Sequence, residues 1–249
     1  MCIAAIAFEA HPHWRLVVTA NRDEVHARAA APLAKWHDEP IIAGRDLLSG
    51  GTWLGVTEGA IQRCVLVTNY RATGFPLPDR PSRGALVTNL LHGADPEVLP
   101  IDPYNPFNLF VAENEAAWLL SNQPSGRRQR VVPGVLGLSN GDFTAPWPKT
   151  RQLCAALEGW LADAYALPEA LFAALAAETP TSPPDAPWNP EGGEPEPRLS
   201  PVFIRNALYG TRCSTLVLID RNGAGQIIER RFGPDGAILG ETAIAFSWE

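Results

Sequence analysis

The chain opens with two short apolar runs, residues 3–8 and 15–20, which are separated by a polar stretch around His11. Each run has the length and the aliphatic content of a buried strand. Together they predict an antiparallel hairpin in which the numbers of paired residues add up to about 23. This register places Cys2 opposite Asn21 or a close neighbour, with Cβ atoms roughly 4.5–5.5 Å apart.

Apolar runs bounded by turn residues recur along the rest of the chain. The further strands that they predict lie at residues 52–57, 61–69, 107–112, 116–121, 131–138, 216–219, 226–232 and 242–248. Several of these runs are apolar throughout, which is typical of strands that are covered on both faces. Residues 27–40 show no periodicity, and we expect a loop there.

A helical period appears in two blocks. The stripe of apolar residues after Ser82 predicts a short helix, with Ser82 as its N-cap and Gly93 at its end. Residues 153–161 and 171–175 predict two more amphipathic helices, parted near Pro168. Hairpins with helices inserted in two blocks indicate an α+β fold, a four-layer αββα sandwich of two antiparallel sheets.

One domain over residues 1–249 is expected, because the length and the 46% hydrophobic content suit one sizeable core. The segment at about 179–201 contains eight prolines, too many for the interior of a sheet or helix. We expect an extended loop there. It is either a passive linker or a flap over a pocket, and Trp188 within it favours the flap.

Charge and hydropathy narrow the kind of partner. The net charge is −7 and no basic stripe is present, which argues against a nucleic acid. No signal peptide is recognisable, and no apolar stretch approaches the ~20 residues that span a bilayer, so we expect a cytoplasmic protein without stable membrane insertion. The residues do not indicate an oligomeric state.

The four cysteines show no C-x-x-C spacing, so we expect free thiols and neither a disulfide framework nor a metal site. The glycine-rich residues 50–55 lack the spacing of nucleotide-binding loops. No cofactor is therefore expected.

The position of Cys2 suggests chemistry. If Met1 is trimmed, Cys2 carries a thiol and a free α-amine on the same Cα, which makes a nucleophile with its own base. The α-amine titrates near ~7.7–8.0, so part of it is unprotonated at neutral pH and can accept the thiol proton. The alternative is that Cys2 lies in a frayed terminus and that Asn21–Glu24 form a solvated turn.

Polar residues at other predicted strand ends have the same two interpretations. Asn69 and Asn140 each follow an apolar strand, where asparagine commonly serves as a turn residue or cap, although its amide is also a competent oxyanion donor. Arg212 precedes a late strand, where a cation usually protects an edge.

Aromatic residues in predicted loops favour a partly apolar small-molecule substrate or ligand. They are Trp36, Trp53, Phe75 and Trp188.

Several motifs, in this order, resemble those of the NRDE family, also called the transport-and-Golgi-organisation family. They are Cys2, Asn21-Arg22-Asp23-Glu24, Gly50-Gly51-Thr52-Trp53-Leu54-Gly55, Thr68-Asn69-Tyr70-Arg71, Ser82-Arg83-Gly84, Tyr104-Asn105-Pro106-Phe107-Asn108-Leu109, Gly137-Leu138-Ser139-Asn140-Gly141 and Gly210-Thr211-Arg212. The resemblance covers nearly the whole chain. We count Tyr70 of the fourth motif, with the loop tryptophans, among the expected substrate-binding residues.

The chain also resembles, more distantly, the N-terminal nucleophile (Ntn) hydrolases of the choloylglycine hydrolase and penicillin V acylase type. This likeness implies an αββα fold and cleavage of non-peptide amides by an N-terminal cysteine. It also implies the following roles: Cys2 as nucleophile, Arg22 as the bordering arginine, Asp23 as the site acid, Asn69 as oxyanion donor, Asn140 as the amide that holds the amine, and Arg212 as the late arginine. In those enzymes the acid follows the arginine by three positions, so Asp23 and Glu24 both stay open as the site acid.

The resemblance therefore implies a cysteine amidohydrolase in which Arg22 favours the thiolate electrostatically. The substrate is not readable from the residues. A second reading is a carrier that keeps the fold without turnover, because relatives in this family are linked to lipid and haem handling.

Overall fold

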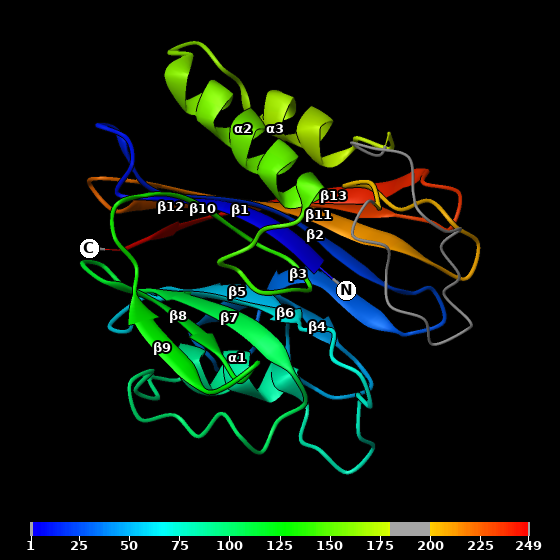
Figure 1. Cartoon of the computed structure of the whole chain (residues 1–249). Helices are drawn as coiled ribbons and strands as arrows, with labels where there is room; N and C mark the ends of the chain where they lie inside the picture. Colours follow the sequence, from blue (N-terminus) through cyan, green and yellow to red (C-terminus); the bar gives the residue numbers. More distant parts are fainter. Residues whose placement is uncertain (1, 180–199, 249) are drawn as a thin grey trace.

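The computed structural model describes residues 2–179 and 200–248, and its elements form four layers (Figure 1). The first sheet, sheet A, has the strand order β10-β1-β2-β11-β12-β13, and the second, sheet B, has the order β3-β4-β5-β6-β7-β8-β9. All neighbouring strands in both sheets run antiparallel. The helices lie on the two outer faces, so the predicted αββα sandwich is confirmed.

The strands of sheet A are β1 (Cys2–Phe8), β2 (Trp14–Val25), β10 (Gly134–Leu138), β11 (Tyr209–Asp220), β12 (Ala224–Phe232) and β13 (Ile238–Ser247). The strands of sheet B are β3 (Ala30–Lys35), β4 (Ile41–Asp46), β5 (Leu54–Thr57), β6 (Cys64–Asn69), β7 (Phe107–Ala112), β8 (Ala117–Ser121) and β9 (Arg127–Arg130). The helices are α1 (Arg83–Leu91), α2 (Pro148–Ala162) and α3 (Pro168–Leu175).

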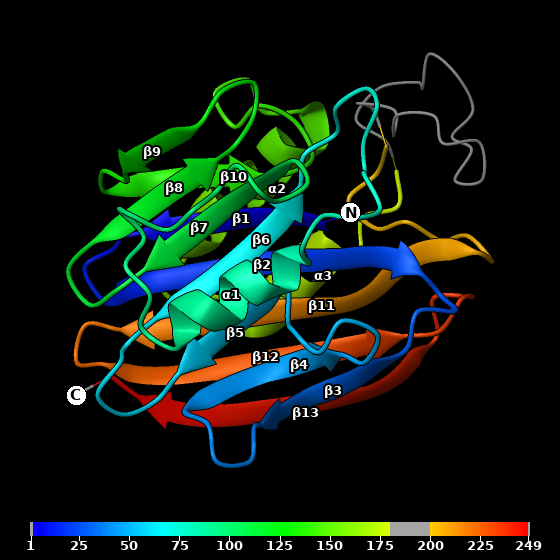
Figure 2. The same ribbon diagram turned by 90° about the horizontal axis from the view of Figure 1, so that it is seen from below.

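Three hydrophobic cores separate the four layers. The core between the sheets includes Ile6, Val18 and Phe110. A second core lies between sheet B and α1, which crosses β5 and β6 (Figure 2). The third core joins α2 and α3 to the outer face of sheet A. Alternate residues of each central strand pack into different cores, because successive side chains point to opposite faces of the sheet.

The predicted helices are confirmed, and their ends follow the expected chemistry. The Ser82 hydroxyl accepts a hydrogen bond from the backbone N–H of Gly84 at the start of α1, at 3.2 Å. Gly93 follows α1 with a φ of 99°, the left-handed conformation of a helix end. Both α2 and α3 begin with proline. None of the helices in the described parts of the chain is long and apolar enough to cross a membrane.

The first hairpin forms, but its register differs by one residue from the prediction. Glu9 has a φ of 50°, and its N–H donates to Arg15 O at 2.8 Å, so the loop is centred on Pro12. Cys2 therefore pairs with Arg22, and Ile3 pairs with Asn21. Strand β2 also continues to Val25, so the tetrapeptide Asn21–Glu24 lies within a strand and not in a turn.

The hydrophobic pattern missed three strands: β4 inside sheet B, and the two edge strands β3 and β9. Strand β3 lies within residues 27–40, where a loop was expected, and a register shift between Ala31 and Ala34 accompanies Pro32. Proline is tolerated there because β3 is an edge strand. Strand β9 consists of polar residues only and forms the other edge of sheet B. The expected proline-rich loop, with Trp188, lies almost wholly outside the described residues.

Candidate active site

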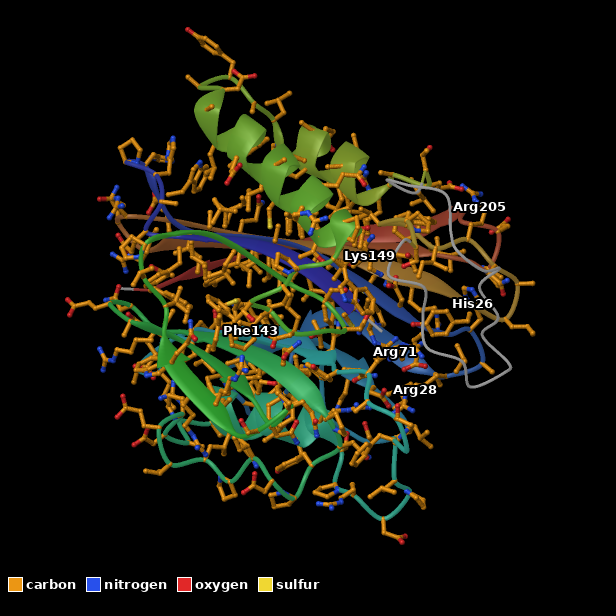
Figure 3. All side chains as sticks on the ribbon, viewed as in Figure 1. His26, Arg28, Arg71, Phe143, Lys149 and Arg205 are labelled. Carbon is orange, nitrogen blue, oxygen red and sulfur yellow. The ribbon has the colours of Figure 1, made fainter. Side chains whose placement is uncertain are left out.

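A cavity of about 770 Å³ lies between the two sheets, at the end of the sandwich where β1 begins. Sheet A contributes Cys2 and Arg22, and sheet B contributes Asp46 and Asn69. Arg28, labelled in Figure 3, also lines it and lies where the chain passes from β2 of sheet A to β3 of sheet B. The volume suits a small-molecule ligand.

Strand alternation divides the tetrapeptide between the two faces of sheet A. Arg22 shares the inner face with Cys2, because directly opposed residues point the same way. Asn21 points to the outer face, where its Nδ2 donates to Leu175 O at 2.9 Å and to Val202 O at 3.0 Å. Its Oδ1 accepts a hydrogen bond from Ser214 Oγ at 2.6 Å. Asn21 therefore fastens the end of α3 to sheet A, and Arg22 faces the cavity.

The Cys2 side chain is buried, with 7% of the residue exposed. Burial raises the pKa of the Cys2 thiol, and the negative charge of Asp23 acts in the same direction. The positive charge of Arg22 and a hydrogen bond from the backbone N–H of Asp23 lower this pKa. Arg22 thus acts in the predicted direction, but burial outweighs it and the thiol is mainly neutral at pH 7.

A carboxylate from sheet B holds two arginines of the site. Asp46 Oδ2 accepts hydrogen bonds from Arg28 Nε at 2.6 Å and from Arg22 Nη2 at 3.3 Å. Burial alone would raise the pKa of Asp46, but the hydrogen bonds from Arg28 and from the Ser49 N–H, with the charges of both arginines, bring it below its usual value. Asp46 was not predicted, since nothing in the sequence marks β4 as a neighbour of β2.

The two candidate acids have different partners. Glu24 Oε2 lies 3.8 Å from Arg22 Nη2 on the inner face. Asp23 Oδ1 accepts a hydrogen bond from Thr211 Oγ1 at 2.7 Å, while the Asp23 backbone N–H reaches the Cys2 thiol. Both residues border the cavity. Asp23 contacts the nucleophile through its backbone, and Glu24 pairs with the arginine beside it.

The two asparagines form one unit at the opposite wall. Asn69 ends β6 and lines the cavity, and its side chain has no hydrogen-bond partner within residues 2–179 and 200–248. Asn140 is fully buried behind it, where its Nδ2 donates to Asn69 O at 2.8 Å. Asn140 does not line the cavity, so its position fits a residue that fixes Asn69.

Two further arginines reach the cavity. Arg212 sits at a bulge in β11, and its Nη1 donates to the carbonyl oxygens of Val25 and Arg28, each at 3.0 Å. Arg83 at the start of α1 was not predicted as a site residue. Burial lowers the pKa of Arg83, and a negative charge on Cys2, which lines the same cavity, acts in the opposite direction. The close packing of Gly51 on Gly84, where a Cβ on Gly51 would meet the Gly84 carbonyl carbon at 2.7 Å, brings this helix start to the cavity.

The expected substrate-binding aromatics are scattered. Trp53 lines the cavity. Trp36 lies in the core under α1, with 8% of the residue exposed and its Nε1 donating to Ala43 O at 3.0 Å. Tyr70 follows Asn69, does not line the cavity, and donates its N–H to Pro106 O at 2.9 Å. Only Trp53 of these three faces the site.

The remaining candidates for chemistry at the cavity are the other three cysteines and any cluster of side chains that could bind a metal ion. All four cysteines are free thiols, as predicted. Burial raises the pKa of Cys64 to about 12 and that of Cys154 to about 11. Cys213 lines the cavity and was not predicted there. Across the described residues, no group of three or more His, Cys, Asp or Glu side chains is arranged to hold a metal ion.

Fold and site together define an αββα sandwich protein with a thiol-bearing, arginine-rich cavity between its sheets. The family model Transport and Golgi organisation 2 matches residues 1–234. The human Transport and Golgi organization protein 2 homolog is 31% identical over 263 residues, and the Bos taurus homolog is 32% identical over 265 residues; in both cases the match covers 92% of each chain. The chain belongs to the Transport and Golgi organisation 2 family, as its motifs predicted.

Among solved structures, the chain is similar to a Caenorhabditis elegans N-acylethanolamine-hydrolyzing acid amidase ortholog. The sequence identity is 13% and the TM-score is 0.47, over 70% of this chain and 86% of that chain.

Proposed function

We propose that this protein is an N-terminal-cysteine amidohydrolase that cleaves a non-peptide acyl-amide bond. The observation that carries the proposal is the cavity shared by the Cys2 thiol, the Arg22 guanidinium and the Asn69 amide. Cys2 and Arg22 are direct cross-strand neighbours. These are the three groups that a thiol nucleophile, its supporting cation and an oxyanion donor require.

The raised pKa of Cys2 favours deprotonation during attack over a preformed thiolate. After removal of Met1, the α-amine of Cys2 accepts the thiol proton as the sulfur adds to the amide carbonyl. The carbonyl oxygen becomes an oxyanion, and Asn69 Nδ2 donates a hydrogen bond to it. The C–N bond then breaks, the ammonium returns its proton to the leaving amine, and a thioester on Cys2 remains. Water hydrolyses this thioester to release the acid.

A carrier function is the second candidate, and the same raised pKa favours it. A buried, neutral thiol is a weak nucleophile, and a cavity of about 770 Å³ can hold a ligand without turnover. The carrier would take a lipid or haem ligand.

The two candidates are separated by screening N-acyl amides for amine release. The amidohydrolase predicts a substrate whose turnover is lost in Cys2→Ser and kept in Cys64→Ser, because Cys64 is buried away from the cavity. If protein that has lost Met1 releases no amine from any amide, and a lipid or haem ligand binds equally to wild type and Cys2→Ser, the carrier stands and the amidohydrolase is rejected.

A further inference from the structure

Arg231 belongs to a row of inner-face residues that crosses sheet A from the thiol to the far wall of the cavity. Cys2 pairs with Arg22, Arg22 pairs with Cys213, and Cys213 pairs with Arg231. Adjacent strands lie about 4.7–4.9 Å apart, so the Cα of Arg231 lies roughly 14 Å from that of Cys2. Arg231 lines the same cavity. A ligand that touches both residues is therefore an extended molecule.

The cavity is strongly cationic for a chain of net charge −7. Its described lining contains seven arginines, against four carboxyl residues, Asp23, Glu24, Asp46 and Glu229. Six of these arginines already have partners. Arg22 and Arg28 donate to Asp46, and the guanidinium groups of Arg45, Arg80, Arg83 and Arg212 donate to backbone carbonyls.

Arg231 is the exception among the seven. Within residues 2–179 and 200–248, its guanidinium has no hydrogen bond and no carboxylate within the 4.0 Å of an ion pair. Glu229 lies two residues away on the same face, but its Oε1 accepts a hydrogen bond from the Leu33 N–H at 2.9 Å, and its carboxyl also binds the Cys213 thiol. The charge of Arg231 acts on Glu229 only at longer range, where it lowers the pKa of that carboxyl. A partly buried guanidinium without a hydrogen-bond partner is costly unless a ligand supplies one.

The surroundings of Arg231 are apolar on one side. Phe232 and Leu239 line the cavity beside it, and Leu239 is 69% exposed. Gly240 pairs with Arg231 across β12 and β13, and a Cβ there would lie 2.5 Å from Arg231 Nη2. The guanidinium thus lies against the bare backbone of Gly240, in a residue that lines the cavity. Such a planar fork binds an oxyanion through two hydrogen bonds.

We propose that Arg231 forms a distal subsite that binds a carboxylate or phosphate group at the end of the ligand remote from Cys2. The ligand is then an extended amphiphile whose apolar part crosses the cavity and whose oxyanion meets Arg231. The reaction at Cys2 rests on the proposed amidohydrolase function, and the distal subsite does not, because binding needs no turnover.

The test is the affinity of dodecanoate, dodecyl phosphate and dodecanol, measured by calorimetry below their micelle concentrations. Arg231→Gln should lower the affinity for the two anions by about 10- to 100-fold, as expected for the loss of a charge-assisted pair. The affinity for dodecanol should stay unchanged. Arg231→Lys should recover part of the loss. The matched control is Arg230→Gln, since Arg230 lies on the outer face and pairs with Glu241 and Glu169. Whichever of dodecanoate and dodecyl phosphate binds the wild type more tightly shows whether the subsite prefers a carboxylate or a phosphate.

Unchanged anion affinity in Arg231→Gln, or an equal loss in Arg230→Gln, overturns the subsite. An equal loss of dodecanol affinity also overturns it, because apolar packing would then explain the effect. If the anion pattern holds while no amide is turned over, the subsite stands and the amidohydrolase fails. If an amide is turned over, and Arg231→Gln changes neither the affinity for the anions nor the KM for the amide, the amidohydrolase stands and the subsite is rejected.

Discussion

The inner face of sheet A changes its chemistry over three successive rows of paired residues. The innermost row is aliphatic and buried, and consists of Ile6, Val18, Val217 and Ile227. The next row is Ala4, Ala20, Thr215 and Glu229, and the last is Cys2, Arg22, Cys213 and Arg231. The first row seals the core, and the last row lines the cavity.

This contrast shows how one sheet can stabilise the fold at its aliphatic end and present reactive side chains at its cavity end. Aliphatic side chains pack tightly against sheet B, whereas guanidinium groups resist burial and require partners or a ligand. Three small residues of the middle row, Ala4, Ala20 and Thr215, mark the boundary between the two. The same strands thus hold the nucleophile rigidly at one end, because their other end is locked in the core.

The largest expected effect at the cavity end is that of Asn69→Ala. An oxyanion donor acts mainly in the transition state, so kcat should fall by on the order of 10²–10³ while ligand binding stays nearly unchanged. The control is Asn122→Ala, an asparagine whose side chain binds backbone groups outside the cavity. Steady-state kinetics with an accepted amide give kcat, and calorimetry on Cys2→Ser protein gives the affinity. A loss confined to affinity would contradict the oxyanion role.

At the core end, Ile6→Val should affect stability alone. Removing one methylene from the row between the sheets should lower the free energy of unfolding by about 0.5–1.5 kcal/mol. Urea denaturation measures this change. The rate of Cys2 alkylation by iodoacetamide should stay the same, and a changed rate would show that core and cavity are coupled more closely than the row pattern implies.

The smallest expected effect is electrostatic, and comes from Arg22→Gln. Arg22 lowers the pKa of Cys2 against the larger effect of burial, so its removal should raise that pKa further. The thiolate fraction at a given pH then falls, and the pH profile of Cys2 alkylation moves to higher pH. Peptide mapping should show severalfold slower labelling of Cys2 at pH 8, with Arg15→Gln as the control. A profile displaced to lower pH would contradict the assigned role of Arg22.

Much of the fold was readable from local pattern. Apolar runs predicted the central strands apart from β4, and Ser82 predicted the start of α1. Edge strands β3 and β9 were not readable, because exposed edges lack an apolar stripe. A one-residue error in the first hairpin had a large consequence, since it exchanges the faces of Asn21 and Arg22.

Local pattern indicated site residues only where neighbours are close in sequence, whereas Asn69 and Arg212, which also line the cavity, were expected from the resemblance alone. Cys2 and Arg22 come together through one hairpin, and the pattern of that hairpin predicted their closeness but misplaced the pairing by one residue. Asp46, Arg83 and Arg231 reach the cavity through pairing of distant strands and the packing of α1. No local signal reports such contacts, which explains why these residues were missed.

The central claim is that Cys2, freed of Met1, is the nucleophile. The most direct measurement is mass spectrometry of the N-terminal peptide after the protein is mixed with an accepted N-acyl amide and quenched in acid. The account predicts a peptide that begins at Cys2 and carries the acyl group as a thioester, with no acyl group on Cys213. Turnover by protein that retains Met1, or by protein whose Cys2 is never acylated, would contradict it.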